Sequence, residues 1–250
     1  RDGLEIYGYL TIPVGSDGKN LPMVVHPHGG PNARDTMGYD PDVQFMANRG
    51  YVVFQPNFRG STGYGAYHYI SANKQFGKTM QDDITDGVNY LIEQGIADPD
   101  RVAIFGGSYG GFMTMAAMTF EPEEFKVGVN IYGVTNWIRT LRSIPAYWES
   151  TRESLYKEMG NPYTEDSLRL YNISPLFHAK NIKNPVMVLQ GANDPRVLQI
   201  ESDEMVQEAR DAGAYVEYVL FEDAGHGFIK KEQQIEGNEK ILTFLENYLK

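Results

Sequence analysis

The sequence contains no cysteine among its 250 residues, which excludes disulfide bonds, thiolate catalysis and cysteine metal sites but identifies no compartment. It also has no apolar run of about 18 residues, so no transmembrane helix is predicted. Basic residues are scarce, because 22 Lys and Arg stand against 33 Asp and Glu and the net charge is -11. Surfaces that bind nucleic acid or anionic lipid are usually basic, so the composition argues against both partners.

The residues that are present fit one soluble α/β domain. Hydrophobic residues make up 42% and charged residues 22% of the chain, as in ordinary globular proteins. We find no repeat, low-complexity stretch or linker, and therefore expect residues 1–250 to form a single domain. The chain opens at Arg1 with strand-like alternation and no visible signal peptide, so we expect a mature or excised piece. The localisation stays open between cytoplasmic and periplasmic.

Short apolar runs alternate with glycine-rich loops and helical segments along the chain. Residues 4–13 alternate like a strand, and residues 97–101 (ADPDR) are interpreted as a turn. Ile84, Val88 and Leu91 recur at helical spacing. Further strands are predicted in LPMVV, YVVFQPN, RVAIF, VGVNIYG, NPVMVLQG and YVEYVLF, and further helices in the segments that begin near residues 108, 200 and 234.

Strands that alternate with helices in this way indicate a mostly parallel central sheet with helices on both faces. Residues from about 134 to 180 lack clean strand alternation and are rich in aromatics, so we expect a small cap-like insertion there. Ligands of such sheets bind at the carboxyl ends of the strands. The loops after residues 28, 58, 105 and 190 all lie at those ends, and the site is expected among them.

FGGSYGG at 105–111 places a serine among glycines directly after the apolar run RVAIF. Glycine is unfavourable in strands and helices, so several together require a reason. Gly106-x-Ser108-x-Gly110 is the pattern of a nucleophile elbow, a strand-to-helix turn that projects a serine hydroxyl above a sheet. A tight turn with an incidental serine is the alternative, and the remaining sequence decides between them.

A nucleophilic serine needs a base, and the base needs an orienting acid. When a serine lies on such an elbow, the acid follows it in the sequence and the histidine comes last. Only two of the five histidines come after Ser108: His226 follows the strand at 215–221, whereas His178 follows no strand. Asp194 follows another late strand, whereas Asp223 is too near His226 in sequence to reach its far nitrogen. We therefore predict Ser108, Asp194 and His226 as the triad.

Acyl transfer also needs backbone N–H groups aimed at the developing oxyanion. The elbow supplies one, the N–H of Tyr109, because this residue directly follows the serine. The early loop HGGP at 28–31 supplies the second, since Gly29 and Gly30 permit close backbone approach, and we select Gly30. HGGP alone also fits a simple turn, but together with the elbow it indicates an oxyanion hole.

Six segments, in this order, make the chain resemble the catalytic domain of the prolyl oligopeptidase family of serine peptidases. The resemblance covers most of the chain. The chain looks most like the branch that contains the acylaminoacyl peptidases and dipeptidyl peptidase-like enzymes. It implies an α/β-hydrolase fold. The segments are HGGP (28–31), NFRGSTGYG (57–65), MQDDITDGVNYLIEQG (80–95), GGSYGG (106–111), NDPRV (193–197) and EDAGHGF (222–228).

The resemblance implies the same triad and oxyanion donors, and it adds substrate contacts. Arg196 is suggested as a contact for a substrate carbonyl, with a salt bridge in the loop as the alternative. Arg59 is expected to buttress the site as a structural residue. Five residues are suggested to line an apolar pocket for the residue before the cut bond, although such aromatics also occur as ordinary core and cap residues: Tyr132, Trp137, Tyr147, Trp148 and Val197.

One part of the family pattern is missing, because the family places a β-propeller before this domain and nothing in these residues resembles one. Exopeptidase specificity is therefore not carried over, and the chain is expected to be an excised domain or an open-site hydrolase.

We predict a serine hydrolase that cleaves peptide or acyl-amino-acid bonds through an acyl-enzyme, on short peptides or acylated amino acids. A carboxylesterase with the same triad is the alternative, and a binding module without chemistry is a third hypothesis that the complete triad disfavours. No cofactor and no metal are expected, because HExxH spacing and a Walker loop are absent. Related enzymes often self-associate, so a homo-oligomer is left open.

Overall fold

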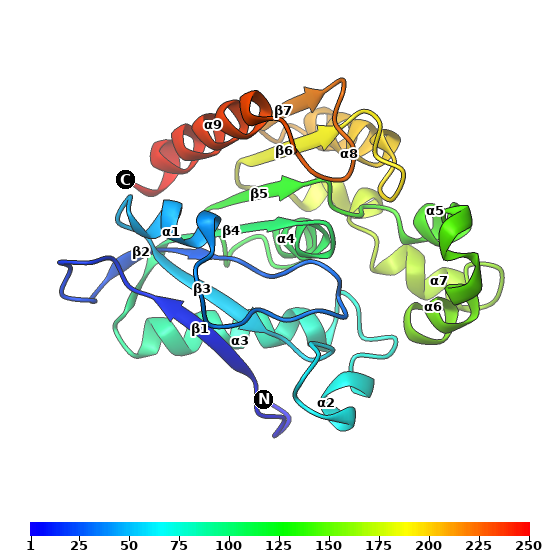
Figure 1. Cartoon of the computed structure of the whole chain (residues 1–250), viewed down its shortest axis with the longest axis horizontal. Helices are drawn as coiled ribbons and strands as arrows, with labels where there is room; N and C mark the ends of the chain where they lie inside the picture. Colours follow the sequence, from blue (N-terminus) through cyan, green and yellow to red (C-terminus); the bar gives the residue numbers. More distant parts are fainter.

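A computed structural model describes all residues 1–250, and its centre is a seven-stranded sheet (Figure 1). The strand order is β1-β3-β2-β4-β5-β6-β7. Every neighbouring pair is parallel except β1 and β3, which are antiparallel. The predicted mostly parallel sheet of an α/β-hydrolase fold is therefore confirmed. The strands are β1 (Tyr7–Thr11), β2 (Leu21–Val25), β3 (Val52–Asn57), β4 (Ala97–Gly107), β5 (Val127–Ile131), β6 (Val186–Gly191) and β7 (Val216–Phe221).

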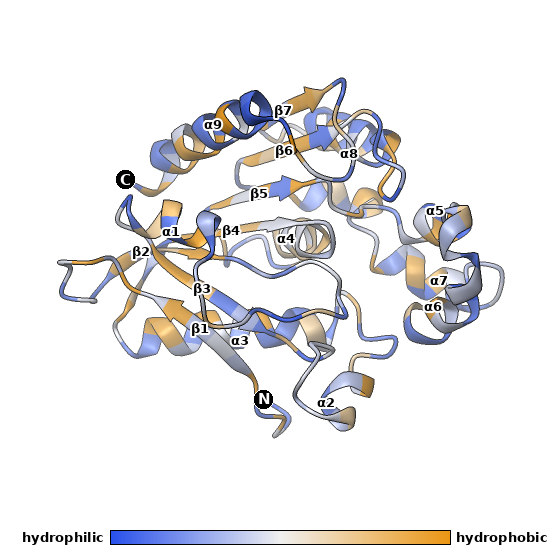
Figure 2. Ribbon diagram, viewed as in Figure 1, coloured by the Kyte–Doolittle hydropathy of each residue, from blue (hydrophilic) through white to orange (hydrophobic).

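Helices cover both faces of the sheet because its strands are apolar on both sides. In β2, Met23 and Val25 join one buried cluster while Val24, between them, joins the other. The first cluster is completed by α3 (Thr79–Glu93), α4 (Tyr109–Phe120) and α8 (Gln199–Asp211), the second by α1 (Pro41–Ala47) and α9 (Lys231–Leu249). Hydrophilic and hydrophobic residues alternate along α9 and α3 (Figure 2), as expected of helices with one buried side. None of the helices has the length and apolar character needed to cross a membrane.

Two strand boundaries differ from those predicted. Strand β1 is confined to Tyr7–Thr11, within the predicted 4–13, because only these residues pair with β3. Strand β4 begins at Ala97, so the segment ADPDR is part of a strand and not a free turn. Ala97 pairs with Leu21, and the register then shifts before Val102 pairs with Met23. The acidic residues that suggested a turn lie at this irregularity, where side chains reach solvent.

The segment between β5 and β6 contains only helices, and it lies where the cap-like insertion was predicted. Its elements are α5 (Trp137–Arg142), η1 (Ala146–Thr151), α6 (Arg152–Met159), α7 (Asp166–Asn172) and η2 (Pro175–Asn181). Figure 1 shows α5, α6 and α7 beyond the carboxyl ends of the strands, while α2 (Ala66–Ile70) follows β3. The insertion therefore borders the edge of the sheet where the site was expected.

Arg59 is buried and structural, as the sequence analysis expected. Its guanidinium donates to both carboxylate oxygens of Asp83 at 2.8 and 2.7 Å, and to Asp2 at 2.7 Å. The backbone N–H of Arg59 also donates to Asp83. This bidentate pair joins the loop after β3 to helix α3 and the N-terminal segment.

Gly237 lies inside α9 and is buried, yet it has room for a methyl group. An added Cβ would lie 3.6 Å from Leu189 Cδ2 and 3.9 Å from Phe221 Cζ, which are ordinary contacts. Glycine inside a helix costs about 0.5–1 kcal/mol relative to alanine. We expect Gly237→Ala to raise the free energy of unfolding by about that amount, and the Tm by about 1–4 °C, in urea and thermal unfolding.

Gly213, which follows α8 with φ +92°, is the matched control. Alanine is strained in that conformation, so Gly213→Ala should lower the stability by about 1 kcal/mol. A fall in stability for Gly237→Ala would show that α9 is packed more tightly against the sheet than the structure describes.

Candidate active site

The predicted elbow is a sharp turn between β4 and α4, with Ser108 as its single intervening residue. Ser108 has φ 57° and ψ −117°, a region that non-glycine residues rarely occupy. Its backbone N–H donates to Ile131 O at 2.9 Å, which ties the turn to the end of β5. The strained turn places the side chain at the carboxyl edge of the sheet, at the mouth of a cavity.

The glycines around Ser108 are required by space. A Cβ on Gly106 would lie 2.5 Å from the Gly110 carbonyl, and one on Gly110 would overlap the carbonyl oxygen of Pro27. A Cβ on Gly111 would lie 2.5 Å from Asn130 Oδ1. These residues therefore let α4 start directly against β4 and let the loop after β2 pass over it.

A continuous line of hydrogen bonds joins three loops at the strand ends. His226 Nε2 lies 3.0 Å from Ser108 Oγ, and His226 Nδ1 lies 2.6 Å from Asp194 Oδ2. Asp194 is buried, and its other oxygen accepts from the backbone N–H groups of Arg196 and Val197 at 2.8 and 3.0 Å. Because Oδ1 is held by two donors, Oδ2 is fixed in direction toward the imidazole. The structure thus brings the three predicted triad residues together.

The two rejected alternatives lie elsewhere. His178 is in η2, where its ring packs edge-on against Phe120 and Tyr171. Asp223 pairs with Lys230 and accepts from Gln233. Neither residue is hydrogen-bonded to Ser108, whereas His226 is.

Two backbone N–H groups beside Ser108 have no acceptor. Tyr109 is the first residue of α4, so its N–H has no partner in the preceding turn of the helix. The N–H of Gly30 donates to no group of the chain. Gly30, Ser108 and Tyr109 line the same cavity, and a Cβ on Gly29 would lie 3.5 Å from Ser108 Cβ. The two N–H groups that were predicted to bind the oxyanion therefore belong to residues that line the same cavity as Ser108.

His28 holds the peptide unit that carries the Gly30 N–H. Its Nδ1 lies 2.7 Å from Gly29 O, and its Nε2 lies 2.8 Å from Ser61 Oγ. Burial lowers the pKa of His28 to about 4, so the ring is neutral at pH 7. A carbonyl only accepts, so Nδ1 carries the proton. The Gly29 carbonyl and the Gly30 N–H share one planar trans peptide, and fixing one therefore fixes the other.

Because His28 is buried and neutral, the stability of the protein should depend on pH. In the unfolded chain His28 has an ordinary pKa of 6.5, so below this pH the unfolded state binds a proton that the folded state does not. The stabilising effect of the neutral ring on folding is therefore complete above pH 6.5 and is lost as the pH falls to about 4. A pKa difference of this size corresponds to about 3 kcal/mol. We expect the urea-derived free energy of unfolding to fall more steeply between pH 7 and 4.5 in the wild type than in His28→Asn.

The comparison with His28→Asn cancels the other titrating groups. Burial raises the pKa of Asp35 to about 6, which acts in the opposite direction, but in both proteins alike. Parallel pH profiles for the two proteins would refute the buried neutral state of His28.

An apolar cavity of about 260 Å³ opens beside Ser108. Among the residues predicted to bind substrate, Trp137, Trp148, Arg196 and Val197 line it. The guanidinium of Arg196 lies 5.5 Å above the Trp148 ring and forms no ion pair, so the salt-bridge alternative is not what the structure shows.

The structure does not bring Tyr132 and Tyr147 to the cavity, contrary to their predicted position. The Tyr132 ring packs on His226 with centroids 4.6 Å apart, because Tyr132 (φ 39°) turns away from the insertion at the end of β5. Tyr147 is 59% exposed and packs edge-on against Trp148. Tyr132 therefore borders the imidazole, and Tyr147 faces solvent.

Half of the residues that line the cavity were not predicted from the sequence. Helical spacing was the available signal, because Trp137, Leu141, Ile144 and Trp148 recur every three or four residues, as do Leu155 and Met159. The missed residues all belong to the segment between β5 and β6: Val134, Thr140, Leu141, Ile144, Pro145, Leu155 and Met159.

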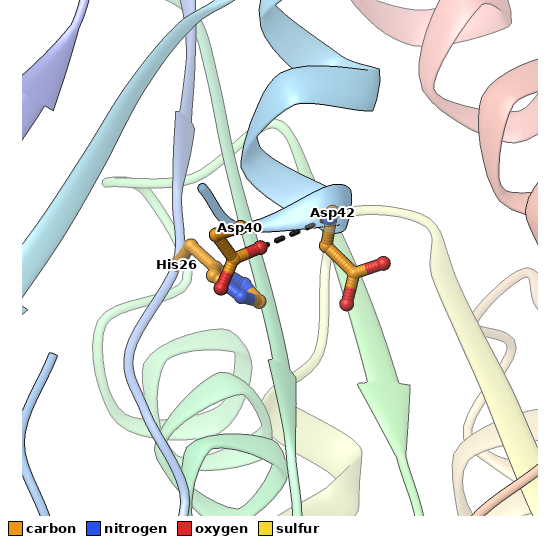
Figure 3. A group of neighbouring side chains, drawn as sticks. All are labelled: His26, Asp40 and Asp42. Atoms are coloured by element: carbon orange, nitrogen blue, oxygen red, sulfur yellow. Dashed lines mark hydrogen bonds between the residues drawn. The ribbon is translucent and has the colours of Figure 1, made fainter. Parts of the chain in front are cut away.

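His26, Asp40 and Asp42 form the one group whose donor atoms are close enough to hold a metal ion, lying within 4.8 Å of one another (Figure 3). Two of these side chains already have partners within the chain. Asp40 Oδ1 accepts from the N–H groups of Asp42 and Val43 and caps α1. The His26 ring bonds to Phe105 O and stacks on the Phe105 ring. None of the three side chains bonds to Ser108, His226 or Asp194, so we assign the group a structural role.

The sheet, the strained elbow and the hydrogen-bonded serine, histidine and aspartate define the class of the α/β-hydrolase-fold serine hydrolases. Comparison with known proteins gives the family. The chain belongs to the prolyl oligopeptidase family, whose model matches residues 37–250.

Individual relatives agree with this assignment. The chain is 43% identical over 253 residues to dipeptidyl aminopeptidase BIII from Pseudoxanthomonas mexicana, covering 98% of this chain and 37% of the relative. A puromycin-hydrolyzing peptidase from Mycobacterium tuberculosis superposes with a TM-score of 0.89 at 31% identity, over 98% of this chain and 37% of that one. An acylaminoacyl peptidase in complex with Z-Gly-Gly-Phe-chloromethyl ketone superposes with a TM-score of 0.89 at 28% identity, over 99% of this chain and 40% of that chain. The chain thus spans less than half the length of these proteins.

Proposed function

We propose that this domain hydrolyses peptide or acyl-amino-acid bonds through an acyl-enzyme, with Ser108 as nucleophile, His226 as general base and Asp194 as the orienting acid. The observation that carries the proposal is the unbroken line of hydrogen bonds from Asp194 through His226 to Ser108, ending at an apolar cavity. The named activities of its relatives, a dipeptidyl aminopeptidase and an acylaminoacyl peptidase, support the same bond class.

The reaction begins when Ser108 Oγ attacks the substrate carbonyl carbon and gives its proton to His226 Nε2. Asp194 accepts from Nδ1, which keeps the neutral imidazole in the tautomer that can take this proton and stabilises the imidazolium. His226 then donates the proton to the leaving amine, and the acyl group stays on Ser108. Water then attacks the acyl carbonyl carbon and gives a proton to His226. The bond to Ser108 Oγ breaks, His226 returns the proton to Oγ, and the acid is released.

The backbone N–H groups of Tyr109 and Gly30 are the proposed donors to the tetrahedral oxyanion. Both are free of other acceptors, so they need not break a bond when the negative charge develops. Each such donor typically contributes about 10²–10³ in kcat. The role of His28 is to keep the second donor aimed at this position.

The cavity is proposed to receive the side chain that precedes the cut bond. An apolar cavity of roughly 150 Å³ holds a benzene ring, so about 260 Å³ admits one large apolar side chain and not a longer peptide. The relative in complex with an inhibitor ending in phenylalanine supports this size. Arg196 lies at the cavity next to the acid loop, where its free guanidinium can donate to a substrate carbonyl.

Short peptides and acylated amino acids are the proposed substrates, and a β-propeller is the partner domain implied by the resemblance. The chain spans only 37% of the dipeptidyl aminopeptidase, which leaves room for such a domain in that relative. A propeller would limit the size of peptide that reaches Ser108.

The test is the hydrolysis of a matched pair, an N-acetyl-phenylalanine anilide and the corresponding nitrophenyl ester. Cleavage of both, together with labelling by an active-site phosphonate, supports a peptidase. Cleavage of the ester alone would make the domain a carboxylesterase, because an anilide needs protonation of a poorer leaving group. Failure of both cleavage and labelling would leave only a binding role.

A further inference from the structure

Glu201 is a buried carboxylate outside the triad. It is 1% exposed, in the first turn of α8, the helix that follows the loop carrying Asp194, Arg196 and Val197. No Lys or Arg forms an ion pair with it. Burial raises the pKa of Glu201, and its hydrogen bonds to backbone and hydroxyl donors oppose that rise. A carboxylate is rarely buried so completely without a function for its oxygens.

Both oxygens of Glu201 accept from one short segment of the insertion. Oε2 accepts from the backbone N–H groups of Thr135 and Asn136 at 3.0 and 2.7 Å, and Oε1 accepts from Thr140 Oγ1 at 3.0 Å. Thr135 Oγ1 donates to the Glu201 backbone carbonyl at 2.8 Å. These donors lie just before and within α5, so Glu201 fastens the start of that helix to α8.

The fastened segment is a wall of the cavity. Val134, Trp137, Thr140 and Leu141 line it from this side, and Arg196 and Val197 line it from the loop that leads into α8. Thr140 both lines the cavity and bonds to Glu201, so only one side chain separates the carboxylate from the space. Glu201 therefore connects the two walls through its hydrogen bonds.

We propose that Glu201 is a positioning residue that fixes the width of the cavity beside Ser108 and thereby sets the selectivity for bulky acyl groups. The inference rests on the function proposed above. The wall can shift without moving the triad, because Asp194 is held by its own loop and by His226. Substrates with a large side chain should therefore be affected and small ones spared.

Two nitrophenyl esters with the same leaving group measure this effect: the acetate, and the ester of N-acetyl-phenylalanine. The readout is the ratio of their kcat/KM values. We expect Glu201→Ala to lower kcat/KM for the phenylalanine ester about 10- to 100-fold, because a misplacement of about 1 Å can cost up to about 10²-fold in rate. The kcat/KM of the acetate should change by less than about threefold, so the ratio of phenylalanine ester to acetate falls. Glu201→Asp keeps the charge but shortens the side chain by one methylene. It should also lower the ratio of the kcat/KM for the phenylalanine ester to that for the acetate.

Glu201→Gln is the conservative variant and should keep the ratio within about threefold of the wild type. Its amide oxygen can accept from Thr135 and Asn136, while its NH₂ group donates to Thr140 Oγ1. Glu204→Gln is the matched control, since Glu204 lies on the same helix and pairs with Arg139 of α5 in a half-exposed ion pair. Such solvent-exposed pairs contribute little, so the ratio should not change.

The outcomes separate this inference from the proposed function. A wild type that cleaves neither ester refutes the function. An active wild type whose ratio is unchanged in Glu201→Ala and Glu201→Asp, or falls equally in Glu204→Gln, overturns the role of Glu201. If thermal melting shows that Glu201→Ala is unfolded, Glu201→Asp decides. Equal losses on both esters in a folded variant mean general damage and also overturn the proposal.

Discussion

Ser108→Ala is expected to lower kcat for any hydrolysed substrate by about 10⁴- to 10⁶-fold and to leave KM nearly unchanged. The loss is large because the acyl-enzyme cannot form without Oγ, and His226 then has no hydroxyl to deprotonate. The N–H groups of Tyr109 and Gly30 remain, so a small rate above that in water should persist. Steady-state kinetics and phosphonate labelling measure the two effects separately.

The two histidines after the elbow provide the control. His226→Asn should lower kcat nearly as much as Ser108→Ala does. The double variant should lower kcat little further, because the two residues act as a unit. His178→Asn should keep wild-type activity, since its ring packs against Phe120 and Tyr171 and forms no hydrogen bond to Ser108 or Asp194. Activity that survives in Ser108→Ala would mean that the nucleophile lies elsewhere.

Gly110→Ala is expected to reduce kcat by at least about 10²-fold through the backbone alone. The new methyl would overlap the Pro27 carbonyl oxygen and lie 3.3 Å from that of His28. Neither oxygen can give way without moving the loop that carries Gly30. Removal of one oxyanion donor by itself costs about 10²–10³ in kcat, and KM should change less.

Gly237→Ala is the matched control for Gly110→Ala, because it adds the same methyl to a buried helical glycine where the nearest atom is 3.6 Å away. It should retain full activity. Wild-type kcat in Gly110→Ala would show that the loop of residues 27–30 moves freely over the elbow, and would contradict the close packing described above. A crystal structure of the variant would locate the displaced peptide.

The fold and the proximity of Ser108, Asp194 and His226 were predictable because their signals are local. Each strand is a short apolar run, and Ser108, Asp194 and His226 each follow one, so the topology of a parallel sheet brings them to a common edge. His178 was rejected because it follows no predicted strand, and Asp223 because it lies only three residues before His226 in the sequence. The early start of β4 was missed because its pairing with β2 includes a register shift that no local pattern shows.

The cavity was predicted less well, because it depends on side-chain direction. Tyr147 and Trp148 are neighbours in one turn of 3₁₀ helix, and only Trp148 faces the cavity. Composition cannot distinguish two adjacent aromatics. Tyr132 was misplaced because its left-handed backbone turns the ring toward His226. Glu201 was overlooked for another reason: its donors are 61 to 66 residues away in the sequence.

Ser108, Asp194 and His226 lie far apart in the sequence, and this separation has a consequence for refolding. Ser108 and His226 are 118 residues apart, and Asp194 and His226 are 32 apart, on loops that follow β4, β6 and β7. Contacts of such long sequence separation form late, whereas helices form within microseconds. Returning hydrolytic activity therefore reports the last stage of sheet assembly, and ellipticity at 222 nm an earlier one.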